Sequence, residues 1–118
     1  HTLAVATGKS RRGLNRILTA LHWSDFFDAT RCADETSSKP DPQMILELLE
    51  ELNFSPEQAV MVGDTEFDME MAVRAQVRRI GVNFGAHSEK RLARYDLEIC
   101  LSHISELNAW VQSDSTIV

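Results

Sequence analysis

The sequence predicts an α/β domain built on a mostly parallel sheet. Short strand-like segments at residues 3–6, 59–62 and 79–82 are too brief for helices and are typical of buried strands. Between them, apolar residues recur at the i, i+3, i+4, i+7 spacing of one helix face. Strands that alternate with amphipathic helices favour parallel pairing, because each helix returns the chain to the start of the sheet.

The first part of the chain predicts two strand–helix units. The strand at 3–6 leads through the loop around Thr7 and Gly8 into a helix with an apolar face of Leu14, Ile17, Leu18 and Leu21. A weak strand follows at 27–30, and a polar loop covers 33–39. The second helix is predicted to begin with Asp41 as cap and Pro42 as its first residue, with a face of Ile45, Leu48, Leu49 and Leu52.

The second part continues the alternation. The second helix is predicted to end at Asn53, and residues 55–58 have a capping-box spacing that predicts a single helical turn. The apolar run at 59–62 is the clearest strand signal. A helix is expected at 68–76, a strand at 79–82 and a short helix at 88–94. A strand at 97–100 and a last helix with an apolar face of Ile104, Leu107 and Val111 follow. The tail from Ser113 is expected to be frayed.

The amino-acid composition disfavours some classes of partner and indicates a cellular compartment. The 118 residues carry 12 Lys and Arg against 18 Asp and Glu, a net charge of −6, and 43% are hydrophobic, which is consistent with one globular domain. The acidic balance disfavours nucleic acid, and no apolar run approaches the roughly 20 residues of a membrane span. Cys32 and Cys100 fit no metal or redox spacing, so we expect two buried small hydrophobes in a reducing, cytoplasmic compartment.

Ligands of open parallel sheets bind beyond the carboxyl ends of the strands. Thr7, Gly8 and Lys9 follow the first strand, where a hydroxyl, backbone N–H groups and a helix N-terminus could bind phosphate. A Walker loop is excluded because it would need glycine at position 3, where the chain has Leu3. The alternative is that Thr7 only caps the following helix.

Two other segments carry candidate charges. Asp64 ends a strand and Asp68 lies four residues later, so the two carboxylates can face one cavity and share a hard cation such as Mg²⁺. Alternatively, Asp68 only complements a helix dipole. Lys39 precedes Pro40, which holds its backbone extended and could aim its ammonium inward, although most loop lysines are solvated charges.

These three segments together resemble the haloacid dehalogenase-like (HAD) superfamily of phosphohydrolases, and most closely its phosphoglycolate phosphatase-like branch. The resemblance implies that Thr7 and Gly8 bind the phosphoryl group and that Lys39 stabilises its negative charge. Asp64 would be the direct Mg²⁺ ligand. Asp68 would belong to the metal site by orienting metal-bound water, or would pair with Lys39.

The resemblance also implies a reaction. A small phosphorylated metabolite such as phosphoglycolate would be hydrolysed through an aspartyl-phosphate, with Thr7, Lys39 and Asp64 as catalytic residues. The family's first motif, Asp-x-Asp, supplies the nucleophile and the general acid/base, and no such motif precedes Thr7. We therefore expect residues 1–118 to be a single HAD-like core-domain fragment without a cap domain, inactive by itself.

A missing motif has a consequence for the sheet. The family has a three-layer Rossmannoid fold with strand order 5-4-1-2-3, so the missing strand is the central one. Either the strand at 3–6 pairs directly with 59–62, or these two bare edges pair with another chain, for example in a homodimer.

Three questions stay open from the sequence. His87 follows a predicted strand and could reach the site, or it could be an ordinary surface histidine. The domain could bind Mg²⁺ or phosphate, or act as an interaction domain, without catalysis. A receiver-type signalling module is a further alternative, but it requires a phosphorylatable Asp where this chain has Thr7.

Overall fold

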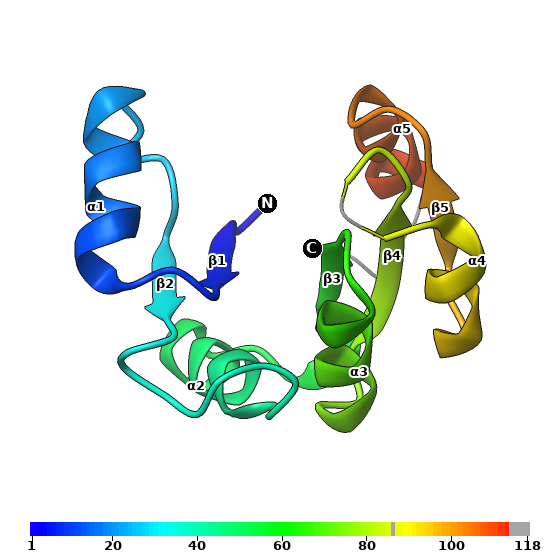
Figure 1. Ribbon diagram of the computed structural model, residues 1–118, viewed down its shortest axis with the longest axis horizontal. Helices are drawn as coiled ribbons and strands as arrows, with labels where there is room; N and C mark the ends of the chain where they lie inside the picture. Colours follow the sequence, from blue (N-terminus) through cyan, green and yellow to red (C-terminus); the bar gives the residue numbers. More distant parts are fainter. Residues whose placement is uncertain (86, 114–118) are drawn as a thin grey trace.

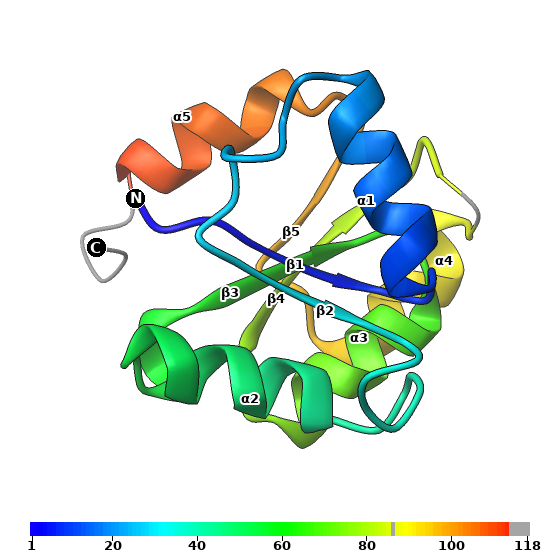
Figure 2. The same cartoon turned by 90° about the vertical axis from the view of Figure 1, so that its left-hand side faces the viewer.

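Strands run through the middle of the molecule, with helices on both sides. The computed structural model describes residues 1–85 and 87–113. In this part of the chain, α1 and α5 lie on one side of the strands and α2 and α3 on the other (Figures 1 and 2). The expected three-layer α/β architecture is confirmed.

The first two strands form a parallel pair. β1 (Ala4–Thr7) pairs with β2 (Ala29–Cys32) along its whole length, and α1 (Arg11–Ala20) connects them. The strand predicted at 27–30 therefore begins two residues late. Phe27 is held in an aromatic cluster with Trp23 and Phe26, with ring centroids 5.1 Å apart for Phe26 and Phe27, so the chain joins the sheet only after it.

The start of α1 shows whether Thr7 caps this helix. Ser10 is the N-cap, and its hydroxyl accepts a hydrogen bond from the Gly13 amide at 3.0 Å. Thr7 Oγ1 instead accepts from the Lys9 amide at 3.1 Å, inside the loop. The interpretation of Thr7 as the helix cap is therefore wrong, and its hydroxyl lies at the carboxyl end of β1.

The second helix matches its predicted limits closely. α2 (Gln43–Leu52) begins one residue later than expected, and the Asp41 carboxylate accepts from the Gln43 amide at 2.9 Å. It ends at Asn53, whose φ of 62° is the left-handed conformation common after helices. The predicted single turn is the 3₁₀ helix at Pro56–Gln58, which has the predicted capping box.

The second half of the chain forms a three-stranded parallel sheet. β3 (Val60–Gly63) pairs with β4 (Arg78–Val82), and β4 with β5 (Ile99–Leu101). The helices are α3 (Glu66–Arg74), α4 (Glu89–Leu92), a 3₁₀ turn (Ala93–Tyr95) and α5 (Ser105–Ser113). Ser113 is the last residue of α5, and the rest of the tail that was expected to fray, residues 114–118, lies outside the described part.

The start of α3 differs from the prediction for a local reason. The helix begins two residues before Asp68 because Thr65 caps it. Thr65 Oγ1 accepts from the Asp68 amide at 3.2 Å, and the Asp68 carboxylate accepts from the Thr65 amide at 3.3 Å. This reciprocal pair is a capping box, and it makes Asp68 a residue of the first helical turn.

The two sheets do not pair with each other. Within the described residues, β1–β2 and β3–β4–β5 are separate sheets, and β1 faces β3 across the space between them (Figure 1). A groove of about 630 Å³ lies there, lined by both strands and by apolar residues of α2 and α5. Of the two alternatives, direct pairing of 3–6 with 59–62 is therefore wrong.

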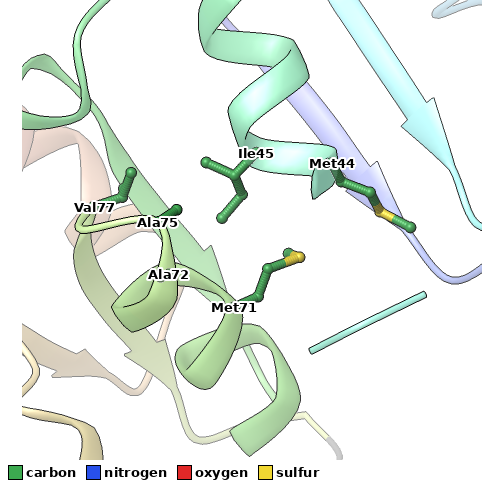
Figure 3. Packing of buried hydrophobic residues seen from close by; sticks show 6 residues of the cluster. All are labelled: Met44, Ile45, Met71, Ala72, Ala75 and Val77. Atoms are coloured by element: carbon green, nitrogen blue, oxygen red, sulfur yellow. The ribbon is translucent and has the colours of Figure 1, made fainter. Parts of the chain in front are cut away.

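Packing of α2 joins the two halves of the molecule on one face. Met44 and Ile45 on α2 pack against residues of α3 and of the segment that follows it, as Figure 3 shows. α2 also contacts β1 and β2, so it spans the two sheets on one face and leaves the groove between β1 and β3 open. Direct pairing would require the strands to approach to about 4.8 Å. The members of this cluster are Met44, Ile45, Met71, Ala72, Ala75 and Val77.

Two smaller expectations concern burial and membranes. Cys32 is fully buried as predicted, whereas Cys100 is only half-buried, and both are free thiols. Burial raises the pKa of both thiols. No helix in the described part of the chain is long and apolar enough to cross a membrane.

Candidate active site

The three segments singled out in the sequence lie at one edge of the molecule. β1 ends at Thr7, and β3 ends at Gly63, directly before Asp64. Lys39 lies in the connection that leaves the carboxyl end of β2. The strands run in one direction, so the connections that follow β1, β2 and β3 all emerge on the same side (Figure 2).

Lys39 and Asp68 are joined directly. Lys39 Nζ lies 2.5 Å from Asp68 Oδ1, although the residues are 29 positions apart in the sequence. Asp68 is only 4% exposed, and Lys39 is half-buried. The interpretation of Lys39 as a solvated surface lysine is therefore wrong, and the expected pairing of Asp68 with Lys39 is confirmed.

The second carboxylate oxygen of Asp68 is also engaged. Oδ2 accepts from the Thr65 hydroxyl at 3.0 Å and from the Thr65 amide at 3.3 Å. Gly63 is close on the other side, since an added Cβ there would lie 2.5 Å from the Asp68 Cβ. Asp68 is thus held rigidly, with one oxygen on Lys39 and the other on the helix start.

Asp64 lies against a residue from the next strand connection. A Cβ added to Gly85 would come within 2.3 Å of Asp64 Oδ2, so only glycine leaves room for the carboxylate. The His87 amide donates to the Asp64 carbonyl at 3.0 Å, which ties the two connections together. The orientation of Asp64 therefore depends on residues that follow β4 as well as on β3.

An ion pair reinforces this junction. Arg91 Nη2 lies 2.9 Å from Glu66 Oε1, linking α4 to the first residue of α3. The Arg91 guanidinium lowers the pKa of the Glu66 carboxyl, and the carboxylate raises the pKa of Arg91. Both side chains are partly exposed, so this pair positions the elements rather than adding much stability.

The donor atoms at this edge suit a hard cation. Residues 1–85 and 87–113 contain no group of three or more His, Cys, Asp or Glu that could enclose a metal. Mg²⁺ is commonly held by only one or two carboxylates, with waters and substrate phosphate completing its shell. The Asp64 carboxylate fits that arrangement, whereas both Asp68 oxygens already accept hydrogen bonds from protein groups.

Thr7 contributes a hydroxyl on the other side of the groove. It is half-buried, and Lys9 fixes its oxygen through the backbone amide. Beside it, a Cβ added to Gly8 would meet nothing within 4 Å, so the backbone here is open to an incoming group. The roles of Thr7, Gly8, Lys39, Asp64 and Asp68 in catalysis and in phosphate or metal binding stay predictions.

Some contacts of the site were not predicted. The contact between Thr65 and Asp68 could have been found, because the two residues have the three-residue spacing of a capping box. The contacts of Gly85 and Arg91 gave no local signal, since each joins residues more than 20 positions apart.

Comparison with known proteins decides the family. Residues 1–82 match the family described as haloacid dehalogenase-like hydrolase. The chain belongs to this family. Family membership replaces the receiver-type alternative and agrees with the parallel sheets and the edge geometry described above.

The relatives of this HAD-family chain include named phosphatases. It is 33% identical over 108 residues to the probable phosphatase IndB of Dickeya dadantii, covering 91% of this chain and 47% of that protein. It is 36% identical over 84 residues to a phosphoglycolate phosphatase of Psychrobacter arcticus, covering 70% and 36%. A predicted phosphatase from Clostridium acetobutylicum superimposes with a TM-score of 0.85 at 27% identity, over 96% of this chain and 53% of that one.

Proposed function

We propose that these 118 residues form the phosphate- and Mg²⁺-binding part of a phosphate-monoester hydrolase that acts on a small phosphorylated metabolite in the cytoplasm. The observation that carries the proposal is the buried Lys39–Asp68 pair beside Asp64 at the carboxyl edge of the strands. A half-buried lysine whose carboxylate partner is itself held by other groups directs its ammonium to a fixed point. The relatives named as phosphatases support this class of reaction.

Each residue has a distinct task in this proposal. The Thr7 hydroxyl and the Gly8 backbone amide would bind phosphoryl oxygens, and the Lys39 ammonium would offset their negative charge. Asp68 would keep Lys39 in place. Asp64 would hold Mg²⁺, which supplies charge neutralisation of the non-bridging phosphate oxygens when it is bound.

The groove between the sheets is where the remaining catalytic groups would enter. A central strand ending in Asp-x-Asp would fit between β1 and β3, with apolar side chains on both faces and its carboxyl end beside Lys39 and Asp64. Its first Asp would attack phosphorus and displace the alcohol of the ester, forming an aspartyl-phosphate that water then hydrolyses to inorganic phosphate and the free carboxylate. The chain spans about half of the length of its relatives or less, and residues 1–118 alone would be inactive.

A second candidate function rests on the same groove. The facing edges of β1 and β3 within the described residues are unpaired with each other, which favours association through these strands. The domain could then be a non-catalytic Mg²⁺- or phosphate-binding or interaction domain, including a homodimer joined at these edges.

Magnesium binding and phosphate release test the proposal together. Equilibrium titration of Mg²⁺ should show binding to the wild-type chain that Asp64→Asn weakens about tenfold or more, whereas exposed Asp25→Asn leaves it unchanged. An aryl phosphate should release no inorganic phosphate with residues 1–118, but should do so with a longer chain carrying the Asp-x-Asp strand.

Three results would count against particular parts. If Asp64→Asn leaves the Mg²⁺ affinity unchanged, Asp64 is not a ligand of the metal site. Asp64-dependent turnover by the 118 residues alone would refute the expected inactivity. Magnesium binding without turnover in the longer chain would favour the non-catalytic alternative.

A further inference from the structure

His87 makes two hydrogen bonds on either side of Thr65. Its backbone amide donates to the Asp64 carbonyl, and its Nδ1 accepts from the Glu66 amide, each at 3.0 Å. Glu66 is the first residue of α3, so its amide is one that the helix itself cannot satisfy. His87, in the connection that follows β4, is thus hydrogen-bonded to both neighbours of Thr65.

The imidazole is also held in place from outside. The Phe67 ring lies 5.9 Å from it, measured between centroids, and His87 is half-buried. The ion pair between Glu66 and Arg91 fixes the same helix start from α4. His87 is therefore more than the ordinary surface histidine that the sequence allowed.

A continuous series of contacts leads from His87 to the site. The two residues hydrogen-bonded to His87 flank Thr65, and Thr65 binds Asp68 through both its hydroxyl and its amide. Asp68 in turn holds the ammonium of Lys39. The segment held by these two hydrogen bonds begins with Asp64 itself, whose carboxylate would hold the cation.

We propose that His87 is a positioning residue, which sets the backbone of Asp64–Glu66 and thereby the orientation of the Asp64 carboxylate and of the Asp68–Lys39 pair. The part of this inference that concerns Mg²⁺ rests on the proposed function. The part that concerns the backbone does not, because both hydrogen bonds exist in the protein without any ligand.

Substitutions of His87 can test its side-chain hydrogen bond separately from its other contacts. In asparagine, Oδ1 is separated from the backbone by the same number of bonds as Nδ1 of histidine, so His87→Asn can still accept from the Glu66 amide. In glutamine the oxygen is one bond further away, and alanine has none. His103→Ala is the matched control, because His103 is exposed in the connection between β5 and α5.

Amide hydrogen exchange of the Mg²⁺-free protein tests the backbone part. Exchange at the Glu66 and Asp68 amides should speed up about tenfold in His87→Ala and in His87→Gln, since the local opening free energy falls by about one hydrogen bond. His87→Asn and His103→Ala should stay within about twofold of wild type. Circular dichroism confirms that each variant is folded, and His87→Asn still decides the question if His87→Ala is not.

Magnesium titration of the same variants tests the consequence for the site. Affinity should fall about tenfold in His87→Ala and His87→Gln and be restored in His87→Asn, as expected when a group that orients a metal ligand is removed. Equal exchange in all variants, or no rescue by asparagine, would overturn the proposal. So would faster exchange with unchanged Mg²⁺ affinity, because His87 would then be merely structural. If the wild type binds no Mg²⁺, the proposed function fails, and exchange alone decides whether His87 positions the loop.

Discussion

The pair formed by Lys39 and Asp68 shows how a buried carboxylate depends on its cation. Asp68 is 4% exposed, so its carboxylate has little access to water and relies on Lys39 and Thr65 for hydrogen bonds. A buried carboxylate that loses its cation is costly, whereas a neutral group of the same shape is not. The pair therefore contributes more to the arrangement of the site than to net stability.

A double-mutant cycle measures this dependence. Lys39→Met should lower the free energy of unfolding by about 3 kcal/mol, because it leaves the Asp68 carboxylate buried without its cation. Adding Asp68→Asn should recover about 1–3 kcal/mol of that loss, since the amide carries no charge. Urea unfolding at constant m-value is the measurement. Strict additivity of the two substitutions would show that the pair is not coupled.

Glycine at position 85 is required by the close approach of Asp64. A methyl group there would lie 2.3 Å from Asp64 Oδ2, so Gly85→Ala should displace the carboxylate and weaken Mg²⁺ binding about tenfold. Gly8→Ala is the matched control for the fold, because a Cβ there meets nothing within 4 Å and the residue has no positive φ. Its unfolding free energy should stay within about 0.5 kcal/mol of wild type. Unchanged Mg²⁺ affinity in Gly85→Ala would contradict the packing described above.

Between elements, Glu35 links the start of α1 to the connection that carries Lys39. Its carboxylate accepts from Arg11 Nη2 at 2.7 Å and from the Cys32 amide at 2.9 Å. The Arg11 guanidinium and the Cys32 amide together lower the pKa of Glu35 from its ordinary 4.5. The same arginine also reaches Thr30 on β2, at 2.7 Å, so three segments meet here.

Acid should weaken this link in a defined pH range. Because the folded-state pKa of Glu35 lies below its unfolded value, the stabilisation is present above about pH 5 and is lost as the pH falls through the folded-state value. Glu35→Gln should therefore reduce the loss of unfolding free energy between pH 6 and pH 3 by up to about 1 kcal/mol, a limit set by exposure of the pair. Exposed Glu98→Gln is the control. An identical pH profile for Glu35→Gln and wild type would exclude a contribution from Glu35.

At the scale of the whole molecule, the groove between the two sheets is the dominant feature. Two parallel strands face each other across it, and its walls are mainly apolar side chains of β1, β3, α2 and α5. An apolar surface of this kind, next to strand edges, favours association with a further strand or chain.

Sedimentation velocity tests association of the 118 residues. The wild-type chain should form dimers as its concentration rises, and Ile104→Lys should shift the population toward monomer, because Ile104 lines the groove and is 58% exposed. Leu46→Lys is the matched control, since Leu46 is 45% exposed on α2 and is not among the groove residues. A monomeric wild type at all concentrations would argue against the homodimer and favour a groove that accepts only a strand of a longer chain.

Sequence patterns by themselves determined the alternation of strands and helices and the three charged segments. Apolar periodicity depends on neighbours a few positions apart, and so do the end of α2 at Asn53 and the turn at Pro56–Gln58. The segments around Thr7, Lys39 and Asp64 were recognisable because each follows the end of a strand or precedes a helix.

Only the tertiary structure decided which of these groups meet. The Lys39–Asp68 bond, the contact of Gly85 with Asp64 and the two hydrogen bonds of His87 join segments that are far apart in the sequence. The separation of β1 from β3 likewise lies in the arrangement of the two sheets, which α2 joins on one face. Such contacts depend on how whole elements pack in three dimensions, and local residue spacing carries no record of that.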